Sequence, residues 1–345
     1  MDLTLTEDQQ LIQTTAAEFV DEWRAKAGVA AVACEPEGHS TELWHEMTSL
    51  GWPGIAIDES RGGVGSGFLE ACLLIEQLGR AAIPSPFLST VACSTPAIAQ
   101  YGTEAQRDEW LGAIAAGSVL AFVDGPDISV AGSTVDGVVE LVPYAAAAEV
   151  LVVAAGEQLL LVDAAAVRTE RLNVVGIDPR YRVRFDSTPV REVLGSGPEL
   201  RESITAHGAT ATCVAMVGGA QGVLDATVAY AKQREQFGKP IGAFQAVQHH
   251  CTNMAIDVLG SRFVAYEAAW RLGAGLPAAT EVAVAKSYVS EAYQRVCALG
   301  HQVHGAIGFT EEHDLHHYTR HAMSAALSFG DATHHTEQLA RILGI

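Results

Sequence analysis

Apolar residues recur every three or four positions over the first part of the chain, which is the spacing of helices that bury one face. The stretch "TEDQQLIQTTAAEFVDEWRAKA" begins with Thr6 as a candidate N-cap, and "STELWHEMTSLGW" begins with Ser40 or Thr41. The same period continues in "GFLEACLLIEQLGRAA" and in "GTEAQRDEWLGAIAAG", which ends at a glycine. We therefore expect a helical domain over residues 1–118.

The period changes over residues 119–197, where short runs rich in Val and Leu are separated by Gly, Pro and Asp. These runs are "SVLAFVDG", "GVVELVP", "EVLVVAA", "QLLLVDA" and "YRVRFDST", and they predict strands of a small sheet or barrel. "LGSGPEL" is expected to be a linker. Helical spacing then returns in four long stretches, the last being "HHYTRHAMSAALSFGDATHHTEQLARIL", which predicts a four-helix bundle over residues 198–345. The predicted fold is mainly α with a small β-domain in the middle.

Composition narrows the possible partners. The net charge is -20, with 41 acidic and 21 basic residues, which argues against nucleic acid or an anionic membrane surface as a partner. The most apolar stretch is interrupted by Glu149, Gly156 and Glu157, so we expect no membrane span, and the N-terminus does not resemble a signal peptide. The six Cys form no C-x-x-C pair, which favours reduced thiols and a cytoplasmic location.

The segment "REQFGKPIGAFQAVQ", residues 234–248, joins two of the predicted bundle helices. A turn between helices requires only its Gly and Pro. Arg234 and Phe237 therefore need another explanation, unless Arg234 forms a surface salt bridge and Phe237 packs at a helix corner.

The stretch "AYAKQREQFGKPIGAFQAVQ", the later "LGHQVHGAIGFTEEHDLHHYTR" and the order of the three zones resemble the acyl-CoA dehydrogenase family over nearly the whole chain. The resemblance implies an FAD bound between subunits, with Arg234 on its pyrophosphate and Phe237 packed against the cofactor. It also implies that Gln302 and the backbone at Gly305 contact the other side of the diphosphate, although Gln302 could instead cap a helix. A guanidinium suits phosphate because its planar fork of donors matches two oxygens.

The family reaction needs a carboxylate that removes the α-proton of an acyl thioester while the β-hydrogen leaves as hydride to the flavin. The usual position of this base, in a "Y-E-G-T" stretch, holds Phe329 here, and the alternative position on the first bundle helix holds Gly208. Asp331 is the nearest acid and hence the candidate base, but it is displaced by about 200° around a helix, and a role as an N-cap or turn residue is the favoured alternative. His207 is a further candidate, or a polar residue lining a cleft.

The middle zone also departs from the family pattern. The resemblance leads us to expect a "T-E-P-x-x-G-S-D" loop and a "W-I-T-N" strand end around the flavin ring. Asp124 and Gly125 stand where Thr and Glu would be, no Gly-Ser-Asp follows, and "VELVPYAAAAEV" lacks the Trp and the Thr. The flavin-ring half of the site is therefore expected to be incomplete on this chain.

Several histidines suggest a different chemistry. His313, His317 and His321 lie four residues apart, which would place them on one helix face where zinc could bind. A solvated or interface face is the competing explanation. His301 and His304 overlap the segment that resembles a flavin contact, which favours a role in packing there.

Three hypotheses follow for the function. The chain is a self-sufficient acyl-CoA dehydrogenase with Asp331 as an unusual base, or a family subunit that completes the FAD site of a catalytic partner chain, or a metal-binding helical scaffold without flavin. The missing base and missing loop favour the second hypothesis. Under this hypothesis the chain resembles one subunit of bacterial heterotetramers that act on acyl-CoA thioesters, whose acyl group is a fatty acyl chain or a steroid side chain. A homo-oligomer is the alternative assembly.

Overall fold

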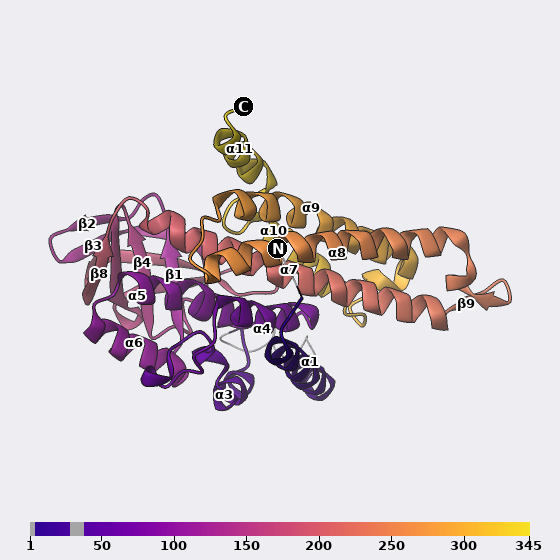
Figure 1. Cartoon of the computed structure of the whole chain (residues 1–345), viewed down its shortest axis with the longest axis horizontal. Helices are drawn as coiled ribbons and strands as arrows, with labels where there is room; N and C mark the ends of the chain where they lie inside the picture. The colour runs from indigo at the N-terminus through magenta and orange to yellow at the C-terminus, as the bar shows by residue number, and fades with distance from the viewer. Residues whose placement is uncertain (1–3, 28–37) are drawn as a thin grey trace.

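The computed structural model describes residues 4–27 and 38–345, and it arranges them as helices, strands and again helices along the chain (Figure 1). The predicted boundaries near residues 118 and 197 fall between helix α6 and strand β1 and between strand β8 and helix α7. Cys34, one of the six cysteines expected to be reduced, lies outside the described residues.

The N-terminal part is helical, as its hydrophobic spacing predicts. Its helices are α1 (Glu7–Ala27), α3 (Thr41–Ser49), α4 (Phe68–Arg80), α5 (Thr95–Tyr101) and α6 (Glu104–Ala115), with short turns at Trp52–Gly54 (η1), Glu59–Arg61 (η2) and Leu88–Ser94 (η3). Two predicted caps are confirmed: the hydroxyl of Thr6 accepts the N–H of Gln9 at 3.2 Å, and that of Ser40 accepts the N–H of Leu43 at 3.2 Å.

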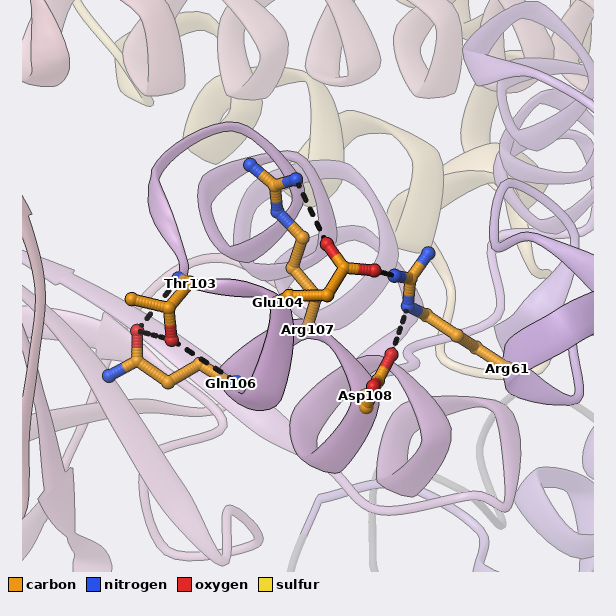
Figure 2. Close-up of polar contacts among 6 residues, drawn as sticks. All are labelled: Arg61, Thr103, Glu104, Gln106, Arg107 and Asp108. Atoms are coloured by element: carbon orange, nitrogen blue, oxygen red, sulfur yellow. Dashed lines mark hydrogen bonds and ion pairs between the residues drawn. The ribbon is translucent and has the colours of Figure 1, made fainter.

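The start of α6 is held both by its own cap and by a neighbouring turn, as Figure 2 shows. Thr103 and Gln106 form a capping box, in which the Gln106 side chain accepts the N–H of Thr103 at 2.9 Å. Arg61 in η2 pairs with Glu104 and donates to Asp108 at 2.8 Å. Acidic residues in this first turn also suit the positive end of the helix dipole.

The middle part consists of two four-stranded sheets with the orders β1-β4-β5-β8 and β2-β3-β7-β6. Their strands are β1 (Leu120–Asp124), β2 (Ser129–Ala131), β3 (Thr134–Pro143), β4 (Val150–Ala155), β5 (Gln158–Asp163), β6 (Arg168–Leu172), β7 (Arg180–Pro189) and β8 (Glu192–Ser196). β1 runs parallel to β4, and the other pairings are antiparallel. The five predicted strands are confirmed, but the predicted linker "LGSGPEL" begins inside β8.

The C-terminal part contains α7 (Leu200–Gln233), α8 (Gln245–Gly273), α9 (Ala279–His304), α10 (Leu315–Leu327) and α11 (Ala332–Leu343). The first four pack against one another as a bundle, whereas α11 packs on α9 and projects from the body of the molecule (Figure 1). The prediction of a single last helix was wrong. Positive φ angles at Phe329 (58°) and Gly330 (93°) end α10 and let α11 start in a new direction.

Helix α7 runs through the centre of the bundle. By length and composition it is apolar enough to cross a membrane, but 72% of its most apolar window is buried inside the protein. A central helix of a globular bundle has the same composition, because neighbouring helices cover it on several sides.

Candidate functional site

A cavity of about 800 Å³ lies between the β-domain, α4, α7 and α10. Its wall includes Ala82, Leu141, Tyr144 and Phe329, which are four of the six described non-glycine residues with positive φ. Left-handed backbone is disfavoured for such side chains and tends to cluster at ligand sites. The cavity is therefore a candidate functional site.

The two positions at which the resemblance expects a base lie next to each other, and Phe329 of the two lines this cavity. Gly208 lies on α7 and Phe329 lies in the break between α10 and α11, yet a Cβ added to Gly208 would come within 2.4 Å of the Phe329 ring. The ring thus rests on the helix where the missing side chain leaves room. Neither position supplies a carboxylate, and an aromatic ring fills the space between them.

Asp331 and His207, the two sequence-predicted base candidates, are not among the residues that line the cavity. Asp331 is the N-cap of α11, where its Oδ1 accepts the N–H of His334 at 2.8 Å and its side chain is exposed. His207 donates from Nδ1 to the Ser203 carbonyl at 2.8 Å, and burial lowers its pKa. The geometry therefore matches the capping role that competes with catalysis at Asp331.

Three carboxylates in the cavity wall already have partners within the chain. Asp124 accepts from Arg201 at 2.6 Å, Glu140 accepts from Arg182 at 2.6 Å, and Asp178 accepts from the Tyr144 hydroxyl at 2.5 Å. Burial and the neighbouring carboxylate raise the pKa of Tyr144 well above its usual value, so the phenol stays a neutral donor. None of the three carboxylates is free to act as a base without losing its partner.

Lys286 on α9 is a residue that the sequence reasoning missed. Its ammonium is fully buried and donates to the carbonyls of Ala326 and Gly330 at 2.8 Å each, so it ties α9 to the segment that carries Phe329. Burial lowers its pKa. A single Lys within the apolar face "VAVAKSYV" was the available signal.

The opposite end of the bundle carries the predicted flavin contacts. Arg234 follows the last residue of α7, and Phe237 and Gly238 form the tip of a hairpin between β9 (Glu235–Gln236) and β10 (Lys239–Pro240). Both tip residues have positive φ, as a two-residue hairpin turn of type I′ requires. Phe237 consequently projects outward and is 92% exposed, although its ring meets that of Phe244 edge-on with centroids 6.1 Å apart.

This hairpin end is rich in cations without partners. Within the part of the chain that the structure describes, Lys232, Arg234 and Lys239 form no ion pair, although the chain as a whole carries a net charge of -20. Lys239 lies over the ring of Phe244, with its Nζ 4.5 Å from the ring centroid. These free cations are suited to an anionic ligand.

Gln302 and Gly305 lie at the same end of the bundle. The ring of Tyr230, one turn before Arg234, stacks on that of His304 with centroids 4.5 Å apart, which joins the ends of α7 and α9. The Gln302 side chain is exposed, and nothing lies within 4 Å of a Cβ placed on Gly305, whose φ is 66°. A ligand can therefore approach this backbone closely.

The residues present fit one half of an FAD better than the other. At the hairpin end, a free guanidinium, an exposed amide and an open glycine backbone suit a diphosphate. At the cavity, the carboxylates are paired, the Gly-Ser-Asp loop is lacking and the Phe329 ring lies against Gly208. The residues present are therefore suited to a diphosphate at the hairpin end, and no matching set for a flavin ring is found in the described cavity wall.

The histidines do not form the predicted helix face. His313 precedes α10, and only His317 and His321 of the three lie on that helix, because α10 begins at Leu315. His301 stacks on Phe309, with centroids 4.3 Å apart, and its Nε2 lies 2.7 Å from the Thr319 hydroxyl. Within residues 4–27 and 38–345, no three His, Cys, Asp or Glu side chains are arranged to hold a metal ion.

Comparisons with known proteins cover almost the whole chain. Residues 6–118 match the family described as "Acyl-CoA dehydrogenase, N-terminal domain", and residues 195–344 match "Acyl-CoA dehydrogenase, C-terminal domain". The acyl-CoA dehydrogenase IpdE2 of Mycobacterium tuberculosis is 30% identical over 329 residues, which is 94% of this chain and 93% of that protein.

Solved structures agree with these matches. The ChsE4–ChsE5 complex from Mycobacterium tuberculosis has a chain that is 27% identical, with a TM-score of 0.93 over 100% of this chain and 99% of that one. The Tcur3481–Tcur3483 steroid ACAD is 27% identical, with a TM-score of 0.88 over 99% of both chains. Butyryl-CoA dehydrogenase from Megasphaera elsdenii, 23% identical, shares the fold with a TM-score of 0.91 over 100% of both chains.

Proposed function

Because the chain belongs to the acyl-CoA dehydrogenase family of oxidoreductases, we propose that it is one subunit of a two-chain acyl-CoA dehydrogenase and completes the FAD site of a catalytic partner. The observation that carries the proposal is the packing of Phe329 on Gly208. Both positions where a family base is expected lack a carboxylate, so the proton of the substrate is removed by the partner chain.

The hairpin end supports a role in trans. Members of the family bind FAD, whose flavin accepts the hydride from the acyl chain. In this chain Arg234 would bind the diphosphate, Phe237 would pack against the cofactor, and Gln302 with the Gly305 backbone would contact the other side of the phosphates. Arg234 and Phe237 lie in the hairpin segment after α7, and Gln302 and Gly305 lie at the end of α9, which the stack of Tyr230 on His304 joins to the end of α7. Figure 1 marks this end of the bundle by β9.

The partner surface is proposed to include α8. Ile256, Leu259, Phe263 and Trp270 are exposed by 61%, 50%, 50% and 39%, and their spacing places them along one side of the helix. A second chain of the same family is the partner that we propose, since the similar ChsE4–ChsE5 structure is a complex of two chains. A homo-oligomer is the other outcome of the test below.

We propose an acyl-CoA thioester as the substrate class of the assembled enzyme, with a fatty acyl or steroid side-chain acyl group. A similar structure is described as a steroid ACAD, which supports the second option. A reducing cytoplasm suits the five described thiols, since all are free and only Cys251 is not fully buried.

The stoichiometry of flavin tests the proposal. The chain is co-expressed with a second acyl-CoA dehydrogenase chain that carries the catalytic carboxylate, the pair is purified, and bound flavin is measured from its absorbance at about 450 nm. We expect one flavin per pair of unlike chains and little flavin in the chain purified alone. Two flavins per pair would show that this chain builds a complete site, and a flavin-loaded homo-oligomer would contradict the subunit role.

A further inference from the structure

The proposed function gives a role to the hairpin end of the bundle and leaves the cavity of this chain without one. We propose that this cavity binds an apolar carboxylic acid, with the carboxylate on Arg180, as a ligand that undergoes no reaction there. The site lies within one chain and involves none of the predicted flavin contacts, so it does not depend on the proposed function.

Arg180 is the first residue of β7 and the one Lys or Arg side chain among the described residues that line the cavity. Its Nη1 lies 3.4 Å from the Leu141 carbonyl, and its Nη2 lies 3.4 Å from the Ser328 hydroxyl. Both distances are near the outer limit of a hydrogen bond. Arg180 forms no ion pair with any residue that the structure describes.

The next arginine on the same face of β7 is an example of a guanidinium whose hydrogen bonds are satisfied by carboxylates of this sheet. Arg182 donates to Glu140 and to Glu170, both at 2.6 Å. Arg180 has no such contacts and keeps its fork of donors available to the cavity. A carboxylate matches this fork with two parallel hydrogen bonds.

Two carboxylates and one histidine of the cavity wall near Arg180 are accounted for. Asp178 is held by the Tyr144 hydroxyl at 2.5 Å, and Glu140 is held by Arg182. His321 is buried, and burial lowers its pKa, so it is neutral near pH 7. An incoming carboxylate would therefore be the strong acceptor that Arg180 lacks.

The rest of the wall determines the class of acid. It is built mainly from aliphatic and aromatic side chains, including Ile83, Phe87, Phe122, Val142, Ile177 and Leu327. Its volume of about 800 Å³ is large enough for a long alkyl chain or a fused-ring system. An acid with an apolar body would bury that body here while its carboxylate meets Arg180.

The backbone near Arg180 is shaped for this purpose. Strand β3 loses register against β7 between Val139 and Val142, which is a bulge opposite residues 181–183, next to the regular pair of Arg180 with Pro143. Leu141 within the bulge has a φ of 63°, and its carbonyl faces Arg180. Bulges and left-handed residues of this kind often re-aim groups next to binding sites.

Calorimetric titration of the full-length chain tests the proposal. The probes are octanoate, its neutral counterpart octanamide, and deoxycholate as a fused-ring acid. We expect one octanoate per chain, with an affinity at least about tenfold higher than that of octanamide, because only the acid forms a charge-assisted pair. The ratio of octanoate to deoxycholate affinity distinguishes a straight-chain ligand from a fused-ring ligand.

Variants assign the effect to the guanidinium. Arg180→Gln should abolish the preference for acid over amide and leave octanamide binding unchanged, which also shows that the cavity is intact. Arg180→Lys should retain part of the preference. Arg184→Gln is the matched control, because Arg184 lies on the same strand face, is exposed and forms no ion pair within the described residues.

Three results would overturn the proposal. These are equal affinity for octanoate and octanamide, an equal effect of Arg180→Gln and Arg184→Gln, and no binding of either acid at millimolar concentration. The proposal would also be overturned if the purified chain contained bound flavin and octanoate displaced it, since the cavity would then be a flavin site. That last result would contradict the proposed function as well, whereas the first three leave it untouched.

Discussion

The cavity wall and the hairpin end of the bundle differ in how their charges are matched. In the wall, Asp124 and Glu140 pair with arginines of the same chain. At the hairpin end, Lys232, Arg234 and Lys239 have no ionic partner among the described residues. A region that satisfies its own charges is stable without a ligand, whereas exposed free cations on an acidic protein indicate an anion supplied from outside. Arg180 is the exception in the wall, because it has no carboxylate partner among the described residues.

The largest expected effect concerns turnover of acyl-CoA. If the cavity of this chain proved catalytic, the contrast between a cavity wall with matched charges and a ligand-binding hairpin end would be wrong. The chain alone should oxidise acyl-CoA at least about a thousandfold more slowly than its complex with a base-bearing partner, because a general base contributes roughly 10²–10⁴-fold. The measurement is acyl-CoA-dependent reduction of an artificial electron acceptor. Asp331→Asn should leave the activity of the complex unchanged. Robust turnover by the chain alone that Asp331→Asn abolishes would establish the self-sufficient alternative.

The next effect concerns flavin retention at the hairpin end. Arg234→Ala should weaken FAD binding by the complex about tenfold or more, because the diphosphate loses a bidentate charged contact. Flavin released on dilution or dialysis provides the measurement. Arg168→Ala is the control, since its side chain is 85% exposed and its ion pair with Asp186 is 3.9 Å long. Equal retention in both variants would mean that the hairpin end does not bind the cofactor.

A smaller effect sharpens the description of the cavity. Gly208→Ala should lower the free energy of unfolding by about 1–3 kcal/mol, because the new Cβ meets the Phe329 ring. Phe329→Ala in the same chain should remove part of that cost. Gly112→Ala in α6 is the control, since the atom nearest to its Cβ would be 3.7 Å away, and it should stabilise by up to about 1 kcal/mol. Strictly additive effects in urea titrations would show that Gly208 and Phe329 are not in contact.

The smallest effect is a dependence of stability on pH. Burial lowers the pKa of His317 from 6.5 to about 4, and it also lowers the pKa values of His301, His304 and His321. The unfolded chain therefore binds more protons than the folded chain between pH 6.5 and about 4, and stability is lost as the pH falls through this window. The melting temperature should decrease accordingly, and His317→Gln should reduce the slope. A melting temperature that stays constant from pH 7 to pH 4.5 would contradict the buried, neutral state of these rings.

Local features were predictable from the sequence because they depend on neighbouring residues. The caps at Thr6 and Ser40 and the five predicted strands follow from short-range hydrogen bonding and hydrophobic period. The break between α10 and α11 was missed because the helical spacing continues through it. The break depends on left-handed backbone at Phe329, and a phenylalanine in the sequence gives no sign that its backbone will adopt this conformation.

Residues of the candidate site could be predicted where they belong to a sequence motif. They could not be predicted where their role depends on contacts between segments that are distant in the sequence. Arg234, Phe237, Gln302 and Gly305 were identified from the resemblance alone, although their actual contacts with FAD stay a prediction. Arg180 was missed because nothing in its neighbourhood in the sequence distinguishes it from Arg182 and Arg184. Only the pairing of strands and the packing of α10 show that Arg182 is held by two glutamates, that Arg184 is exposed, and that Arg180 lines the cavity without a carboxylate partner among the described residues.

The amino-acid sequence alone indicates the family, the succession of helical, β and helical zones, and the lack of Asp or Glu at the two positions where the resemblance expects a base, because each depends on residue identity and spacing along the chain. The tertiary structure decides that Phe329 lies on Gly208, that Asp331 caps a helix, and that Phe237 projects from a hairpin. These facts depend on which distant segments meet. The free energy of that packing selects the backbone angles that expose one side chain and bury another.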